Sequence, residues 1–195
     1  MTKRIPQILL LIVSILIALY VINERIIKRQ IEKESAPDPA SFTLCPPTQK
    51  DSEGPFYISG IPYTDQLSPP NIVGDKLIVK GKVTLTDCRT PLTDTTLDIW
   101  HADANGNYDN TWYRGKVRVD DEGNYQFETI RPSGYSSGVI RRSPHIHFKV
   151  FKDNRELLTS QMYFEKTIGV AESQIINLGI QNQVLTGTFN IIITP

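Results

Sequence analysis

The hydrophobic pattern divides the chain into two unlike parts, and the first is a continuous apolar run. Residues 8–22 contain 14 apolar residues out of 15, with Ser14 as the exception. As a helix this run is roughly 22 Å long, at about 1.5 Å per residue, against a bilayer hydrocarbon core of roughly 30 Å. A helix that is apolar around its whole circumference is a poor core helix for a small soluble domain. We therefore predict a membrane anchor or signal segment over residues 1–33.

The residues that flank the apolar run indicate how it is used. Residues 23–29 read Asn-Glu-Arg-Ile-Ile-Lys-Arg, without the small-x-small pattern of a signal peptidase site, so we expect an uncleaved anchor. Lys3 and Arg4 before the run favour a body on the exported side, periplasmic or extracellular, and this is the orientation we expect. Four basic residues after the run favour the opposite orientation: Arg25, Lys28, Arg29 and Lys33.

The second part of the chain is patterned for short β-strands. Residues 34–44 are typical of a linker, and eight of the 13 prolines lie between Pro37 and Pro70, which excludes helix there. Further on, alternating or β-branched runs are separated by turn residues, at 77–85, 96–101, 115–120, 124–130, 145–151, 159–164 and 186–194. We predict that residues 45–195 form an all-β body, folded as an antiparallel β-sandwich.

Charge and cysteine content narrow the class of protein. The chain has 21 basic and 21 acidic residues, which argues against a nucleic-acid binder built on bulk positive charge. Residues 1–35 carry six of the basic and three of the acidic side chains, so the body is mildly acidic. Cys45 and Cys88 fit one disulfide in an oxidising compartment, and they fit two buried thiols equally well.

The clearest chemical signal is a pair of histidines in the run from His145 to Phe151. On a strand, the period of two places His145 and His147 on one face and Ile146 and Phe148 on the other. Two imidazoles on one face can chelate one metal ion, although a polar strand face can also simply carry two histidines. The chain has only three histidines in all, which favours the metal site.

Two histidines do not complete a metal site, so the other ligands must come from elsewhere. The sequence has no CxxC and no HExxH motif, which makes a zinc site hard to assemble. Asp103 or Asp109 would complete a two-His-one-carboxylate iron site. Tyr108 and Tyr135, each after a glycine-containing turn, would instead supply phenolates suited to Fe(III). Either tyrosine alone also fits a packed aromatic side chain.

Four motifs, in order, resemble those of the intradiol ring-cleavage dioxygenases, the family of catechol 1,2-, hydroxyquinol and protocatechuate 3,4-dioxygenases. Residues 97–108 resemble the first ligand motif, and residues 129–135 with 142–148 resemble the second. Residues 159–164 and 53–57 match further family patterns. The resemblance covers roughly residues 45–165, and the order of the motifs makes it specific.

The resemblance implies both a cofactor and a reaction. It implies a β-sandwich that holds one non-haem Fe(III) through four side chains: Tyr108, Tyr135, His145 and His147. It further implies that a catechol chelates the iron and that Tyr135 leaves the metal and accepts a substrate proton. Cleavage with O2 between the two hydroxylated carbons would then give a cis,cis-muconate-type diacid.

Three further residues match family positions around the metal. Arg142 and Gln161 match catalytic positions, where a guanidinium would stabilise negative charge that builds up on the ring. Tyr57 matches the substrate mouth. The alternatives are a surface charge for Arg142, a backbone hydrogen bond for Gln161 and an ordinary turn for Tyr57.

The sequence departs from the family pattern at two places. The family usually has Pro-Gly-x-Tyr before its second tyrosinate, whereas residues 132–135 read Pro-Ser-Gly-Tyr, so we expect Gly134 to form the turn with positive φ. The sequence lacks the helical N-terminal dimerisation region that is typical of catechol dioxygenases, and it does not decide between a monomer and a homo-oligomer. The remaining alternatives are a metal-free transthyretin-like or carbohydrate-binding sandwich and an enzyme that uses another metal ion.

Overall fold

A computed structural model describes residues 4–35, 44–137 and 139–195, which divide into two compact units with the boundary between Thr43 and Leu44. The first unit contains α1 (Arg4–Ser35). Within α1, the stretch Leu9–Gln30 has a mean hydropathy of 2.2, is not buried, and is long enough to cross a membrane; a signal sequence would pass the same test. The predicted linker begins inside α1, and its residues 36–43 lie outside the described part of the chain.

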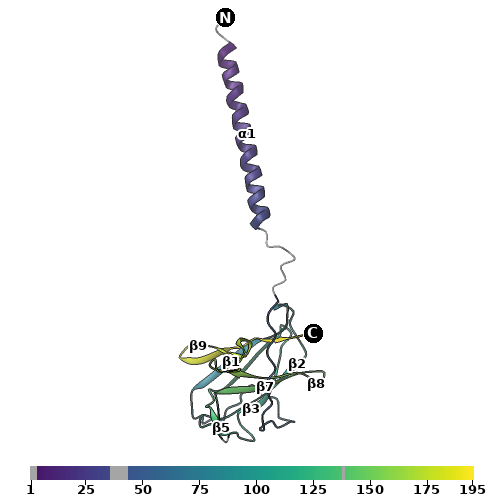
Figure 1. The fold of residues 1–195 in the computed structure, drawn as a ribbon, viewed down its shortest axis with the longest axis vertical. Coiled ribbons are helices and arrows are strands. Elements are labelled where there is room, and N and C mark those ends of the chain that lie inside the picture. The colour runs from purple at the N-terminus through teal and green to yellow at the C-terminus, as the bar shows by residue number, and fades with distance from the viewer. Residues whose placement is uncertain (1–3, 36–43, 138) are drawn as a thin grey trace. The chain divides into compact units, whose positions relative to one another are not determined.

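The second unit is built mainly from β-sheet, as the hydrophobic pattern predicts (Figure 1). One sheet has the order β11 (Ile191–Ile193), β1 (Lys76–Leu85), β10 (Val184–Thr188) and β9 (Asn177–Gln181), with β4 (Asn124–Ile130) also paired to β1. The second sheet has the order β3 (Arg114–Arg118), β2 (Thr95–His101), β7 (His145–Lys152) and β8 (Arg155–Tyr163). β5 (Tyr135–Ser137) and β6 (Ile140–Arg142) form a separate hairpin. A 3-10 turn at Glu172–Gln174 is the helical element described in this unit.

The prediction of purely antiparallel sheets is wrong for the last strand of the chain. β1 pairs in parallel with both β10 and β11, whereas the sheet that contains β7 is antiparallel throughout. The expected strand 186–194 is split because Phe189 and Asn190 leave the ladder, and the Asn190 Oδ1 accepts the backbone N–H of Lys82 at 3.0 Å. Gly81 is required here, since a Cβ at this position would lie 1.8 Å from the Phe189 carbonyl oxygen.

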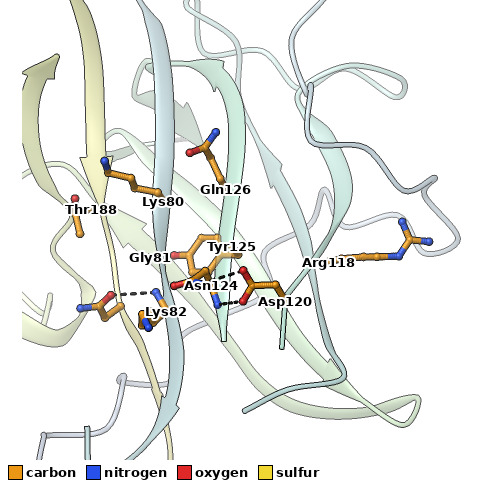
Figure 2. Close-up of a pocket in the computed structure, with 10 residues that line it drawn as sticks. Lys80, Gly81, Lys82, Arg118, Asp120, Asn124, Tyr125, Gln126 and Thr188 are labelled. Atoms are coloured by element: carbon orange, nitrogen blue, oxygen red, sulfur yellow. Dashed lines mark hydrogen bonds between the residues drawn. The ribbon is translucent and has the colours of Figure 1, made fainter. Parts of the chain in front are cut away.

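Figure 2 shows Lys80, Gly81 and Lys82 of β1 beside Tyr125 of β4 and Thr188 of β10. The hollow that these residues line has a volume of about 810 Å³. None of the predicted site residues lines this hollow.

Both large sheets supply side chains to one hydrophobic core. Ile146, Phe148 and Val150 of β7 are completely buried in that core, next to side chains of β1, β2, β4 and β8. The period-two prediction for this strand is therefore confirmed. His145 and His147 point to the other face, and they are nevertheless buried, with 2% and 1% of their surface exposed. Other segments must therefore cover this face of the sheet.

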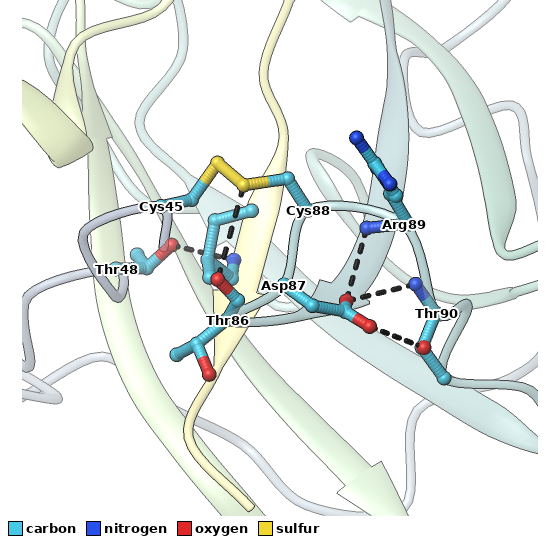
Figure 3. The surroundings of a disulfide bond; sticks show 8 residues. Cys45, Thr48, Thr86, Asp87, Cys88, Arg89 and Thr90 are labelled. Carbon is cyan, nitrogen blue, oxygen red and sulfur yellow. Dashed lines mark hydrogen bonds between the residues drawn. A yellow bond between two sulfur atoms is a disulfide. The ribbon is translucent and has the colours of Figure 1, made fainter. Parts of the chain in front are cut away.

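One of the covering segments precedes β1, and we call residues 45–57 the strap. Its backbone is bonded to both large sheets: Thr48 donates to the Ile192 carbonyl at 3.0 Å and Asp51 to the Thr159 carbonyl at 3.0 Å. Its first residue, Cys45, forms a disulfide with Cys88, which lies in the turn that follows β1 (Figure 3). Of the two alternatives for the cysteines, the structure has the disulfide.

Candidate metal centre

Four aromatic side chains converge on the covered face of β7. His145 and His147 come from the strand, Tyr108 from the loop after β2, and Tyr135 from the first position of β5. Neighbouring ring centroids lie 4.6 Å apart for the two histidines, 5.7 Å for Tyr135 and His145, 5.5 Å for the two tyrosines and 6.3 Å for Tyr108 and His147. The structure thus brings together the four residues expected as metal ligands.

The two imidazoles present nitrogen lone pairs to this centre. The Nδ1 atom of His145 lies 2.5 Å from the Ser143 carbonyl oxygen, which places the ring proton on Nδ1 and leaves Nε2 as an acceptor. The Nε2 atoms of His145 and His147 face each other at 3.0 Å. Burial lowers the pKa of both imidazoles, and together with the neighbouring His145 it lowers the pKa of His147 to about 2. Both rings are therefore neutral at physiological pH, as metal ligation requires.

The Tyr108 hydroxyl is a buried polar group without a hydrogen-bond partner among the described residues. Leaving such a group unsatisfied costs about 1–3 kcal/mol, so a native structure normally supplies a partner or a ligand. Burial raises the pKa of this phenol, and the adjacent Tyr135 raises it further. A strongly Lewis-acidic ion would reverse this shift, because it stabilises the phenolate directly.

The donor set therefore fits Fe(III), with two neutral imidazoles and two phenol oxygens in one buried cluster. The alternative site with two histidines and one carboxylate does not form, because both candidate aspartates bind backbone N–H groups of their own turns. Asp103 Oδ1 accepts the backbone N–H groups of Asn105 and Asn107, both at 2.8 Å, and Asp109 Oδ1 is bound in the same way by the following turn. Among the residues that the structure describes, no group of three or more His, Cys, Asp or Glu side chains could hold a metal.

The two tyrosines meet because their loops pack against each other. Ser133 donates its N–H to the Asp103 carbonyl at 3.0 Å, and a Cβ on Gly106, whose φ is +84°, would lie 2.7 Å from the Gly134 carbonyl oxygen. The expected positive φ at Gly134 is wrong, since its φ lies outside that region. Glycine is needed there for a different reason: a Cβ would lie 2.5 Å from the Arg142 carbonyl oxygen across the β5–β6 hairpin.

Comparison with known proteins identifies the family of the chain. The dioxygenase family profile matches residues 52–191. The chain belongs to the intradiol dioxygenase family. Chlorocatechol 1,2-dioxygenase of Pseudomonas putida is 32% identical over 136 residues, which cover 58% of this chain and 52% of that protein. The chain spans about half the length of the curated relatives it matches.

Two solved structures show the same fold. The dioxygenase domain of a dioxygenase–carbohydrate-binding fusion protein from Streptomyces sp. SirexAA-E has a TM-score of 0.68 and 30% identity, over 75% of this chain and 97% of that one. The crystal structure of the Pseudomonas putida chlorocatechol 1,2-dioxygenase has a TM-score of 0.67 and 28% identity, over 76% of this chain and 72% of that one.

In this member of the intradiol dioxygenase family, two of the three predicted catalytic residues, Arg142 and Gln161, contact each other. The Arg142 Nη2 donates to the Gln161 Oε1 at 2.9 Å, and the Gln161 Nε2 donates to the Ser52 carbonyl of the strap at 2.9 Å. Arg142 is half-buried and Gln161 is fully buried. Arg142 is therefore hydrogen-bonded and not a free surface charge, and the Gln161 amide makes a backbone hydrogen bond, the alternative named for it, in addition to its contact with Arg142.

Tyr57, the residue expected at the substrate mouth, and its neighbour Phe56 contact different groups. The Tyr57 hydroxyl donates to the Asp98 carboxylate at 2.9 Å, and its ring packs on Trp100 at 4.9 Å, so this side chain is directed away from the four rings. Phe56 stacks on Tyr108 at 4.1 Å and contacts Tyr135 edge-on at 5.9 Å. Phe56 is 38% exposed, which is more than any of the four rings of the cluster. The Gly54-Pro55 pair in the sequence indicated that this segment was of interest, but it did not single out Phe56.

The third histidine lies outside the cluster. His101 is buried in β2, with its Nδ1 2.7 Å from the Ala102 carbonyl oxygen and its Nε2 2.7 Å from the Thr129 hydroxyl. Burial lowers the pKa of His101 to about 4. Both ring nitrogens have partners, so this histidine has a structural role.

Proposed function

We propose that the body of this protein is an Fe(III)-dependent intradiol dioxygenase that cleaves a catechol-type ring with O2 to a cis,cis-muconate-type diacid. The observation that carries the proposal is the convergence of His145, His147, Tyr108 and Tyr135, in which the buried Tyr108 hydroxyl oxygen has no hydrogen-bond partner among the described residues. The family membership supports the same reaction class. We further propose that the two large sheets, which share one core, are the layers of an intradiol-type β-sandwich.

Iron bound by these four residues would supply a Lewis-acidic, redox-active centre that activates a chelated catechol toward O2. The chain's own residues have separate tasks. His145 and His147 would hold the ion as neutral imidazoles, and the hydrogen bond from His145 Nδ1 to the Ser143 carbonyl would orient the His145 ring. Tyr108 and Tyr135 would supply the two phenol oxygens, and the Tyr135 oxygen would also accept a proton from a substrate hydroxyl. Tyr108, whose ring is stacked on Phe56, would serve as a ligand only.

Arg142 supplies positive charge next to the substrate. Its guanidinium is bonded to Gln161, so it is oriented before substrate binds and needs little reorganisation during the reaction. Negative charge that develops on the ring is stabilised by a fixed cation in a partly buried site more strongly than by water. Phe56, the exposed ring that stacks on Tyr108, packs against one face of the substrate ring and helps to exclude water.

The N-terminal unit sets the location in this proposal. α1 has the length and composition of a membrane span, and we propose that residues 1–33 anchor residues 45–195 to a membrane, with the body on the exported side. The Cys45–Cys88 disulfide supports an oxidising compartment. Labelling of the body in intact cells by an impermeant reagent tests the orientation, and labelling only after lysis would contradict it.

A spectroscopic titration tests the metal site and the reaction. Purified protein loaded with Fe(III) is expected to show a visible tyrosinate-to-iron charge-transfer band, which shifts when catechol is added, and to release a muconate-type product under O2. The double variant Tyr108→Phe/Tyr135→Phe should lose both the band and the iron. Tyr113→Phe, a tyrosine outside the four-ring cluster, is the control.

Two results would count against this function. Wild-type protein that stays colourless and refuses stoichiometric iron would favour a metal-free binding module. Retention of iron by the Tyr108→Phe/Tyr135→Phe variant would favour a different ligand set, while a product cleaved outside the two hydroxylated carbons would assign extradiol chemistry instead.

A further inference from the structure

We propose that Asp51, in the strap, is a positioning residue of the site, and that it orients the Arg142 guanidinium through the hydroxyl of Tyr163. The inference rests on the proposed function, because it assigns a task to residues around that centre. Asp51 and Tyr163 carry none of the roles assigned to the metal ligands. They belong to segments far apart in the sequence, and they meet because the strap crosses the end of β8.

The Asp51 carboxylate is the end point of a hydrogen-bond chain that begins at Arg142. The Asp51 Oδ2 accepts the Tyr163 hydroxyl at 3.0 Å and the Gln174 Nε2 at 3.0 Å. The backbone N–H of Asp51 donates to the Thr159 carbonyl, and the Gln174 Oε1 accepts the N–H of Ala171 at 3.1 Å. The carboxylate is therefore held from several sides.

The Tyr163 hydroxyl has one proton and three polar neighbours. These are the Asp51 Oδ2 at 3.0 Å, the Gln161 Oε1 at 2.8 Å and the Arg142 Nη2 at 3.3 Å. A carboxylate is a stronger acceptor than a neutral amide oxygen, so the proton is donated to Asp51. The oxygen of Tyr163 is then free to accept a hydrogen bond from Arg142.

A second branch runs in the same direction. The Gln161 Oε1 accepts from Arg142 and its Nε2 donates to the Ser52 carbonyl, the residue next to Asp51. Two chains of polarised hydrogen bonds thus connect the guanidinium to neighbouring residues of the strap. The strap thereby determines the direction in which the Arg142 guanidinium points.

Without this tether Arg142 has room to move. A cavity of about 660 Å³ is lined by Arg142 together with Asp51, Tyr163 and Ile168. Arg141 also lines this cavity and would repel Arg142, which the negative charge of Asp51 offsets. Loss of the Asp51 charge is expected to let the guanidinium leave its present orientation.

Steady-state kinetics of the iron-loaded protein test the proposal with Asp51→Asn, which keeps the shape and removes the charge. We expect kcat to fall about tenfold, the equivalent of one charge-assisted hydrogen bond, with KM changed much less. The iron content and the charge-transfer band of the resting protein should stay as in the wild type, because the four ligands are not touched. Asp94→Asn, the same change at an exposed turn, is the matched control.

A double-mutant cycle distinguishes positioning from general damage. In an Arg142→Gln background, Asp51→Asn should have almost no further effect on kcat, because the residue through which it acts is gone. Tyr163→Phe keeps the ring against His145 and should reproduce the effect of Asp51→Asn, so the test survives if one variant fails to fold.

Three outcomes would overturn the positioning role. These are an unchanged kcat in both single variants, effects that are fully additive with Arg142→Gln, or a loss of iron that matches the loss of activity. A wild-type protein without iron or ring cleavage would instead overturn the proposed function itself, and the two failures are therefore distinguishable.

Discussion

The two halves of the candidate metal centre are built in different ways. His145 and His147 come from one strand, and their shared direction follows from the backbone alone. Tyr108, Tyr135 and Phe56 come from a loop, a short hairpin and the strap, and they meet only because these segments pack together. The strand alone thus places the two histidines, whereas the covering segments bring in the two tyrosines and bury the site.

The difference is visible in the close contacts that each half needs. On β7, the alternation of side chains places both histidines on one face, and a contact with the Ser143 carbonyl orients the His145 ring. The covering segments require glycine at close approaches, as at Gly106 and Gly134, and the disulfide at the start of the strap. Four sets of substitutions test this difference between β7 and the segments that cover it.

The largest effect is expected from the strand. His147→Gln should remove a ligand that no other described residue can replace, so Fe(III) retention should fall by more than the about 10–100-fold that loss of an outer-shell partner costs. Lys80→Gln, at an exposed lysine of β1, is the control and should load iron normally. Competition against a chelator measures both, and equal retention by wild type and His147→Gln would remove the strand from the site.

The disulfide should matter next. It closes a loop with a sequence separation of 43, and its removal in Cys45→Ser/Cys88→Ser is expected to lower the free energy of unfolding by about 2–4 kcal/mol. Urea unfolding with and without reductant measures this, and the double variant should be insensitive to reductant. Faster iron release from the variant would show that the anchored strap protects the centre, whereas an unchanged rate would limit the disulfide to stability.

His101 predicts the dependence of stability on pH. Burial lowers the pKa of His101 from 6.5 to about 4, so the unfolded chain binds a proton in this window and the folded protein does not. The neutral His101 ring therefore contributes about 3 kcal/mol to the free energy of unfolding above pH 6.5. This contribution is lost as the pH falls from 6.5 toward 4. Urea unfolding of iron-free wild type and His101→Gln between these pH values isolates the effect, because the other titrating groups are common to both. Parallel curves would contradict it.

The smallest effect concerns the strap beside the strand. A Cβ on Gly54, with φ +73°, would lie 3.1 Å from the Cε1 of His147, whereas Gly60, with φ +75°, has nothing within 4 Å of its Cβ position. Both alanine variants should lose about 1–2 kcal/mol of stability from backbone strain. Only Gly54→Ala should also shift the charge-transfer band and weaken iron binding. Identical behaviour of the two variants would mean that the strap does not touch the ligand.

Part of this arrangement was predictable because it depends on local periodicity. The long apolar helix, most of the strands, and the direction of His145 and His147 follow from side-chain patterns over a few residues. The parallel pairing of β1 with β10 and β11 was not, since the partner of a strand depends on contacts between distant segments. The hairpin of β5 and β6 was missed because each strand has three residues, too few for a period.

The identity of the family could be argued from motifs, while the roles around the centre needed the fold. The Gly-Pro-Phe-Tyr run marked a segment of interest, but which of Phe56 and Tyr57 faces the rings depends on the Asp98 side chain of β2 and on the path of the strap. Asp51 carried no signal at all, because its partners are 112 and 123 residues away in the chain.

The sequence by itself determined the residue types that meet at this site and the face on which the histidines lie, because both are properties of short segments. Only the tertiary structure decided which carboxylates are used up in turns, which aromatic ring covers Tyr108, and where the guanidinium of Arg142 points. The physical reason is that hydrogen bonds and burial depend on distances between segments, and such distances are set when the loops and the strap pack onto the sheet.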